Sequence, residues 1–256
     1  MQFETMSRRV FLGSAMAATC TRASATVPTL DRLIARNTAA RGGAQRLNVL
    51  RSMEAIVRIT EPSFSVIGRY LADASGLVRV DIYADGKRVF TEGVDAAGAW
   101  ELHADSTAAK VGTEKGMQAL LHGIEFNLIG LNRMAGRGHR LALASPAEDS
   151  GRYVVQLMLK DGFETQLFIS RENWQIVARQ DRRAYHVDVD PTAKNIESRF
   201  SDFRRTGGIV SPFRGQDIDL DTGKEVGRNE TLRVGWNVAT VGRFPRDAVP
   251  LPAPAL

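Results

Sequence analysis

The feature that most constrains this chain is an alternation of apolar and polar residues that recurs along most of its length. Val78, Val80 and Ile82 alternate with polar neighbours, which is typical of a strand buried on one face. Met53, Ala55, Val57 and Ile59 fall in the same way on one side of an earlier run. Turn signals such as Asp85-Gly86 separate these runs and indicate antiparallel hairpins.

Helical patterns are confined to the start and the middle of the chain, so the sequence predicts a mainly β, α+β fold. One large antiparallel sheet of about ten or eleven strands is expected to curl, with helices covering its concave face. Twelve runs have the pattern of a strand, at residues 53–59, 64–72, 78–84, 88–94, 100–103, 140–144, 153–160, 163–170, 175–183, 196–205, 209–220 and 230–238. The expected helices lie at residues 30–40, 44–50 and 114–131.

The central helical segment has two features that bear on function. Its apolar residues follow helical spacing and form one stripe: Met117, Leu120, Leu121, Ile124, Leu128 and Leu131. Its glycines recur every seven residues, at Gly116, Gly123 and Gly130. Because glycine weakens a helix by up to about 1 kcal/mol relative to alanine, two interpretations follow. The segment is either two shorter helices broken near Gly123 or one loosely held helix that moves.

The N-terminal segment has the order of a secretory signal: charged residues, a short apolar run, then small residues. Residues 7–12, which contain Arg8 and Arg9, resemble the twin-arginine (Tat) export signal of bacteria. Ala23 and Ala25 form a small-x-small cleavage site, so residues 1–25 are expected to be removed. An N-terminal core helix and a lipoprotein acylated at Cys20 are the other interpretations.

Removal of this leader changes the chemistry available to the chain. Cys20 is the single cysteine, so the mature chain has no thiolate nucleophile and no disulfide. Its formal net charge falls from +5 to +3, which is too balanced to indicate nucleic-acid binding. Residues 26–245 are expected to form one domain, followed by a proline-rich tail at 246–256.

One group of residues deserves comparison with metal sites. His186, Asp188 and Asp190 would project from one face if they shared a strand, and together they offer one nitrogen and two oxygen ligands. The alternative is a solvent-exposed edge strand that runs into the turn at Pro191. No paired-histidine zinc spacing is present elsewhere.

A row of carboxylates also allows two interpretations. Asp217, Asp219 and Asp221 alternate with apolar residues and therefore share one strand face. Such a row could perform acid–base chemistry if its pKa values were raised. The favoured interpretation is the wet face of an edge strand, where like charges discourage pairing between sheets.

Several stretches resemble the family of exported proteins similar to the LolA and LolB lipoprotein carriers. They are residues 40–47, which contain a Gly-Gly break; Trp100 after a Gly-Ala turn; residues 201–204; and the later pairs Gly208-Ile209 and Pro212-Phe213. The resemblance implies an unclosed β-barrel with helices in its mouth and an apolar cavity. Known members hold acyl chains or lipids and carry them through the periplasm, although a Tat leader is unusual for the carriers.

Together these observations predict an exported periplasmic protein without enzymatic activity or cofactor, which binds a lipid, acyl chain or other hydrophobic ligand. The predicted ligand-binding residues lie on the central helix and on a facing strand: Met117, Leu120, Leu121, Ile124, Leu128, Val155, Leu157 and Leu159. Its expected partners are the ligand, an envelope protein and, through the leader, the Tat machinery. The alternatives are a secreted metal-dependent hydrolase that uses His186, Asp188 and Asp190, and a structural envelope module that binds another protein.

Overall fold

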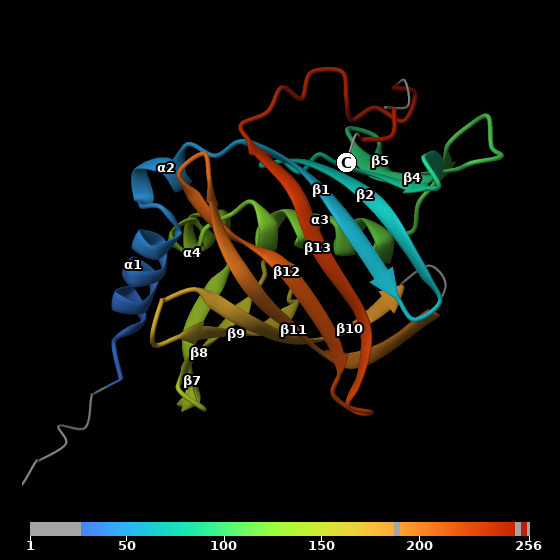
Figure 1. Ribbon diagram of the computed structural model, residues 1–256. Coiled ribbons are helices and arrows are strands. Elements are labelled where there is room, and N and C mark those ends of the chain that lie inside the picture. Colours follow the sequence, from blue (N-terminus) through green and yellow to red (C-terminus); the bar gives the residue numbers. More distant parts are fainter. Residues whose placement is uncertain (1–26, 187–189, 249–251, 255–256) are drawn as a thin grey trace, which may run out of the picture.

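The chain forms one large antiparallel sheet that curls without closing (Figure 1). The computed structural model describes residues 27–186, 190–248 and 252–254. Over these residues the spatial order of the strands is β6-β5-β4-β3-β2-β1-β13-β12-β11-β10-β9-β8-β7. In chain order the strands are β1 (Ser52–Glu61), β2 (Phe64–Asp73), β3 (Val78–Ala84), β4 (Lys87–Asp95), β5 (Gly98–His103), β6 (Lys110–Val111), β7 (Arg140–Asp149), β8 (Arg152–Met158), β9 (Glu164–Ser170), β10 (Ile176–His186), β11 (Asp190–Thr206), β12 (Ile209–Asp219) and β13 (Lys224–Trp236). The predicted curled antiparallel sheet is confirmed.

Within the described ranges the sheet contains thirteen strands, more than the ten or eleven expected. One of them, β6, has only two residues, which is too short to show an alternating pattern. Strands that are neighbours in sequence pair with each other, except that β6 and β7 lie at opposite edges of the sheet and β1 also pairs with β13. Met53 lies opposite Trp236 there, so the first and last strands meet in the middle of the sheet.

The helices occupy one side of this sheet. They are α1 (Leu30–Arg41), α2 (Ala44–Asn48), α3 (Glu114–Asn127) and α4 (Leu131–Met134), followed by a short 3-10 turn, η1 (Ala135–Arg137). The Thr113 hydroxyl oxygen accepts a hydrogen bond from the Gly116 backbone N–H at 2.9 Å and so begins α3. The helix continues through Gly123 and ends at Asn127, so the interpretation of a break near Gly123 is wrong.

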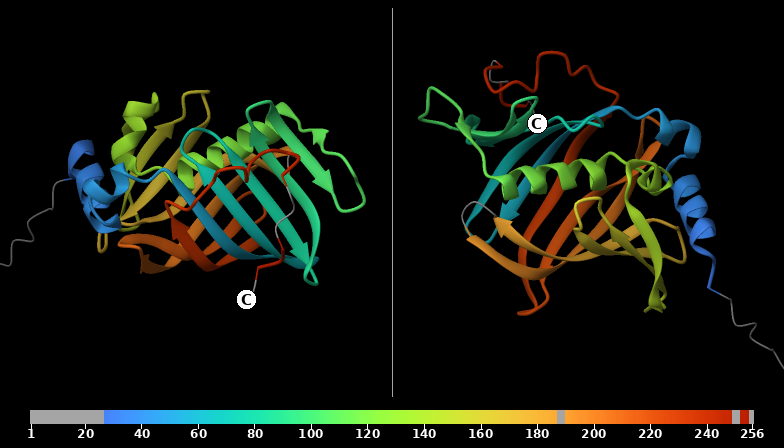
Figure 2. Two further views of the ribbon diagram at one scale, coloured as in Figure 1. Left: turned by 90° about the horizontal axis from the view of Figure 1, so that it is seen from above. Right: turned by 180° about the vertical axis from the view of Figure 1, so that it is seen from behind.

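Helix α3 lies across the concave side of the sheet, between its two ends (Figure 2, right). It contacts β3, β4 and β5 near its beginning. At the other end of the sheet the His122 side chain reaches the β8–β9 turn, where its Nε2 lies 2.7 Å from Asp161 Oδ2. The prediction that a helix covers the concave face is confirmed.

Two glycine pairs, Gly42-Gly43 and Gly207-Gly208, lie where the α1–α2 turn meets the β11–β12 hairpin. Gly42 has a φ of 127°, and a Cβ placed on it would lie 2.4 Å from the carbonyl oxygen of Gly208. A Cβ on Gly208 would in turn lie 2.7 Å from Nε of Arg46. The glycines of these two sequence motifs therefore permit a close approach of backbone segments that are far apart in sequence.

The segment that follows β13 packs over the convex face of the sheet, and we call residues 239–248 the C-terminal strap. Phe244 is 4 % exposed, and the Arg246 guanidinium donates hydrogen bonds of 3.0 and 2.9 Å to Asp95, while its backbone N–H donates a third, of 3.3 Å. Under the strap, Arg79 and Asp81 are 2 % and 1 % exposed. The polar side of β3 is thus buried, whereas its alternation indicated a solvated face.

No helix among the described residues has both the length and the apolar character that crossing a bilayer requires.

Candidate ligand-binding cavity

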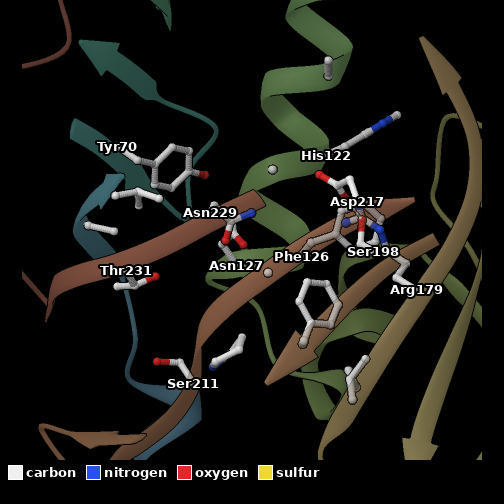
Figure 3. A pocket seen from close by; sticks show the side chains of 18 of the residues that line it. Tyr70, His122, Phe126, Asn127, Arg179, Ser198, Ser211, Asp217, Asn229 and Thr231 are labelled. Atoms are coloured by element: carbon white, nitrogen blue, oxygen red, sulfur yellow. Dashed lines mark hydrogen bonds between the residues drawn. The ribbon is translucent and has the colours of Figure 1, made fainter. Parts of the chain in front are cut away.

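A cavity of about 820 Å³ lies between the concave face of the sheet and α3 (Figure 3). This volume is within the range of about 300–1,000 Å³ that is usual for small-molecule sites. Its walls come from β1, β2, β3 and β9–β13 of the sheet, from α3, and from the C-terminal end of α1. The cavity therefore exists because the sheet curls around the helix without closing on it.

The most apolar wall is the inward face of β1. Met53, Ala55, Val57 and Ile59 occupy alternate positions of that strand, and all four line the cavity. Successive side chains of a strand point to opposite faces, so this spacing delivers one continuous apolar row. The alternation of these four residues is thus the sequence signal that locates the cavity.

Helix α3 contributes a mixed face to the cavity. Its lining residues are Lys115, Gln118, Ala119, His122, Gly123, Phe126 and Asn127. Phe126 and, from the β8–β9 turn, Phe163 supply aromatic surface, and their ring centroids lie 6.4 Å apart. The Arg179 guanidinium stacks on the Phe126 ring, 4.1 Å from its centroid.

The eight residues predicted to bind the ligand lie elsewhere. Ile124, Leu128, Val155, Leu157 and Leu159 are at most 3 % exposed and belong to the main hydrophobic core.

The other three, Met117, Leu120 and Leu121, are half-buried and pack against the same core. None of the eight is among the described residues that line the cavity. The structure brings the eight together as a packing interface, because the most apolar stripe of a helix is the one that is buried against the rest of the protein.

A tyrosine of the cavity wall lies next to α3 at Gly123. A Cβ on Gly123 would lie 3.5 Å from the hydroxyl oxygen of Tyr70, which lines the cavity from β2. Burial raises the pKa of Tyr70 well above its usual value, and the charge of Glu125 acts in the same direction, whereas the nearby Asn127 side chain opposes them. Tyr70 is therefore a neutral hydroxyl in the cavity wall at any physiological pH.

One part of the wall is polar. Asp217 of β12 accepts hydrogen bonds from Arg183, at 3.2 Å, and from Tyr185, at 3.4 Å, and it also accepts one from the Ser198 hydroxyl. Burial raises the pKa of Tyr185, and the charges of Asp217 and Glu61 raise it further. The Asp217 carboxylate is thus engaged by three donors within the protein.

This arrangement corrects the interpretation of the aspartate row as the wet face of an edge strand. β12 lies between β11 and β13 and is a central strand, so Asp217 faces the cavity. Asp219 is 6 % exposed, and its side chain accepts the backbone N–H groups of Asp221 and Thr222 in the following turn. The three carboxylates therefore have separate structural roles.

The candidate metal ligands do not share a strand. β10 ends at His186 and β11 begins at Asp190, and the two residues pair across the hairpin. Asp188 lies outside the described residues. His186 Nε2 is 2.9 Å from Glu61 Oε2, which joins this hairpin to the end of β1. Within the described parts of the chain, no three His, Cys, Asp or Glu side chains are grouped so that they could hold a metal ion.

At the α1 end of the cavity lies Arg41, the last residue of that helix. Its Nη1 donates one long hydrogen bond, of 3.5 Å, to the carbonyl oxygen of Ile129. Burial lowers the pKa of Arg41 to about 10. No pattern in the sequence singled out this residue, because its environment is formed by segments distant in sequence.

Comparisons with known proteins establish the fold. No family model matches the chain, and no curated protein matches it. A LolA superfamily protein from Nitrosomonas europaea has a similar structure, with a TM-score of 0.56 and 14 % identity over 87 % of this chain and 100 % of that one. A DUF1329 family protein from Desulfovibrio piger gives a TM-score of 0.53 and 7 % identity over 83 % of this chain and 95 % of that one. The LolA-like fold that the sequence motifs indicated is confirmed.

Proposed function

We propose that this chain binds a lipid, an acyl chain or a similar hydrophobic ligand in the cavity between α3 and the sheet. The observation that carries the proposal is the cavity of about 820 Å³ behind the apolar row of β1. Each methylene buried there would contribute about 0.8 kcal/mol, so a long chain binds without many polar contacts. The proposal contains no chemical step.

In this proposal the residues that contact the ligand are those of the observed wall. Val57 and Phe126 offer apolar surface from opposite sides of the cavity, and Thr231 lies on β13 next to Val57. The eight residues predicted from the sequence have an indirect role: they hold α3 against the core and so fix the position of the wall.

The proposed setting is the bacterial periplasm, where the chain would carry its ligand to an envelope protein partner. Two observations support this setting: the LolA-like fold and the N-terminal sequence. The leader, with Arg8, Arg9, Ala23 and Ala25, lies outside the described residues. Recognition by the Tat machinery is therefore proposed from the sequence pattern alone.

Native mass spectrometry of protein purified from a periplasm tests both parts of the proposal. The expected mass is that of a chain beginning at Thr26 plus a co-purified lipid. A chain with an intact leader contradicts the export pathway, and a chain without bound lipid contradicts the function.

A matched pair of variants tests the location. Thr231→Trp adds an indole ring inside the cavity and should remove the bound lipid. Arg233→Trp adds the same ring at an exposed position of the same strand and should retain the lipid. Circular dichroism checks that both variants are folded. Equal lipid content in the two variants would place the ligand elsewhere.

A further inference from the structure

Arg41 is half-buried, and it differs from other arginines that the fold removes wholly or partly from water. Arg79 donates to both oxygens of Asp81, over distances of 2.9 to 3.1 Å, and Arg137 binds both oxygens of Glu125. In the cavity wall itself, Arg179 Nε lies 2.8 Å from Asp181 Oδ2. Each of these guanidinium groups is therefore neutralised by a carboxylate.

Arg41 has no such partner. Among the residues that the structure describes, no acidic side chain lies within 4.0 Å of its guanidinium, and its one hydrogen bond is the long contact to the Ile129 carbonyl. The removal of a charged group from water is unfavourable unless the group is paired and hydrogen-bonded. The lowering of its pKa by burial, with no opposing contribution from an acidic neighbour, agrees with this geometry.

The other polar groups of the cavity do not supply the missing charge. Gln175 and Asn127 are neutral amides, and Tyr70 is a neutral hydroxyl. Asp217 is the single acidic side chain among the described lining residues, and Arg183 together with Ser198 and Tyr185 already engages it. The cavity thus presents a cation without a counter-ion beside an apolar wall.

We propose that the ligand is an anionic amphiphile, with an acidic head group bound by Arg41 and a hydrocarbon chain lying along the β1 row. This inference rests on the proposed function and specifies the class of ligand. Carboxylate and phosphate head groups share the required chemistry, because both accept two parallel N–H bonds from a guanidinium. An uncharged head group would leave Arg41 without a counter-ion.

Three probes with the same sixteen-carbon chain test the inference: hexadecanoate, hexadecyl phosphate and hexadecanol. Their dissociation constants are measured on the leaderless chain by tryptophan fluorescence, at a pH where both acids are ionised. The expected result is that at least one acid binds at least tenfold more tightly than hexadecanol. The acid that binds more tightly shows whether the site prefers a carboxylate or a phosphate head group.

Variants then locate the effect. Arg41→Gln should reduce the preference for the acid to less than threefold while the affinity for hexadecanol stays nearly constant, which also shows that the cavity is intact. Arg41→Lys retains the charge and should keep most of the preference. Arg228→Gln is the matched control, because Arg228 also lines the cavity but already pairs with Glu225.

The outcomes separate the two proposals. Binding of none of the three probes overturns both the function and the inference. Equal affinity for acid and alcohol, or a preference that survives in Arg41→Gln, overturns the anionic head group and leaves hydrophobic binding in place. Loss of the preference in Arg41→Lys or in Arg228→Gln also overturns the assignment to the charge of Arg41.

Discussion

The surroundings of Arg79 and Arg41 show how one chain treats buried charge in two ways. Arg79 lies on the convex face under the C-terminal strap, where it binds Asp81 and also donates to the Arg243 carbonyl at 3.3 Å. Thr91 adds a further hydrogen bond to the same carboxylate, at 2.8 Å.

Arg41, in contrast, borders a cavity, and in the described part of the chain its guanidinium makes one long hydrogen bond. Arg79 is thus neutralised without a ligand, whereas Arg41 at the cavity has no acidic partner among the residues that the structure describes. Three measurements of protein stability test this contrast.

The largest effect is expected from Asp81→Ala. The substitution leaves Arg79 buried and unpaired, and the loss of one partner of a buried pair costs about 3–5 kcal/mol of the free energy of unfolding. Urea denaturation measures the loss. Glu172→Ala, at an exposed site, is the control and should change stability by about 0.5 kcal/mol or less. A loss for Asp81→Ala no greater than that of the control would refute the view that pairing stabilises this region.

A smaller effect is expected when acidic pH protonates Glu125, the carboxylate that binds Arg137. Burial alone would raise the pKa of Glu125, but the hydrogen bonds from Arg137 and the close His139 side chain outweigh it and hold the pKa below its usual value. Because the pKa is lower in the folded state, the stabilisation is complete above the unfolded pKa and is lost as pH falls through the folded one.

Urea denaturation of the wild type and of Glu125→Gln at neutral and acidic pH tests this. The wild type should lose more stability on acidification than the variant does, and the difference should be smaller than the loss in Asp81→Ala. If the free energy of unfolding falls equally in the two proteins on acidification, the charge of Glu125 does not stabilise the fold.

The smallest effect is expected from Arg41→Met in the ligand-free protein. Methionine keeps a long side chain and removes a cation that has one weak hydrogen bond, so stability should change by about 1 kcal/mol or less in either direction. A loss as large as that of Asp81→Ala would show that Arg41 is required for folding, and the contrast between the two arginines would disappear.

Much of the sheet could be predicted because strand patterns are local. The alternation in residues 78–84 and 53–59 located β3 and β1, and two-residue turns located the hairpins. The pairing of β1 with β13 had no such signal, since it joins residues about 180 positions apart. β12 is an interior strand because β11 and β13 both pair with it, and the β1–β13 pairing places it still further from an edge. The alternation within a single strand does not show how many partners that strand has, so the aspartate row by itself could not distinguish an edge from the interior.

The candidate site was predicted in part. The sequence identified α3 and its apolar stripe, but it placed the ligand on that stripe, whereas the cavity adjoins the opposite, mixed face with Gln118, His122 and Phe126. Hydrophobic periodicity shows which side of a helix is buried. It does not distinguish burial against the protein from burial against a ligand.

By itself the sequence determined the strands, the helices and the curled antiparallel class of the fold, because apolar periodicity and turn residues act over a few neighbouring positions. The tertiary structure alone decided that the sheet stays open around α3 and that Asp217 finds three donors. It also decided that Arg41 borders the cavity with no acidic side chain paired to it among the described residues. These features depend on contacts between segments that lie far apart in the chain, and such contacts leave no periodic trace in the sequence.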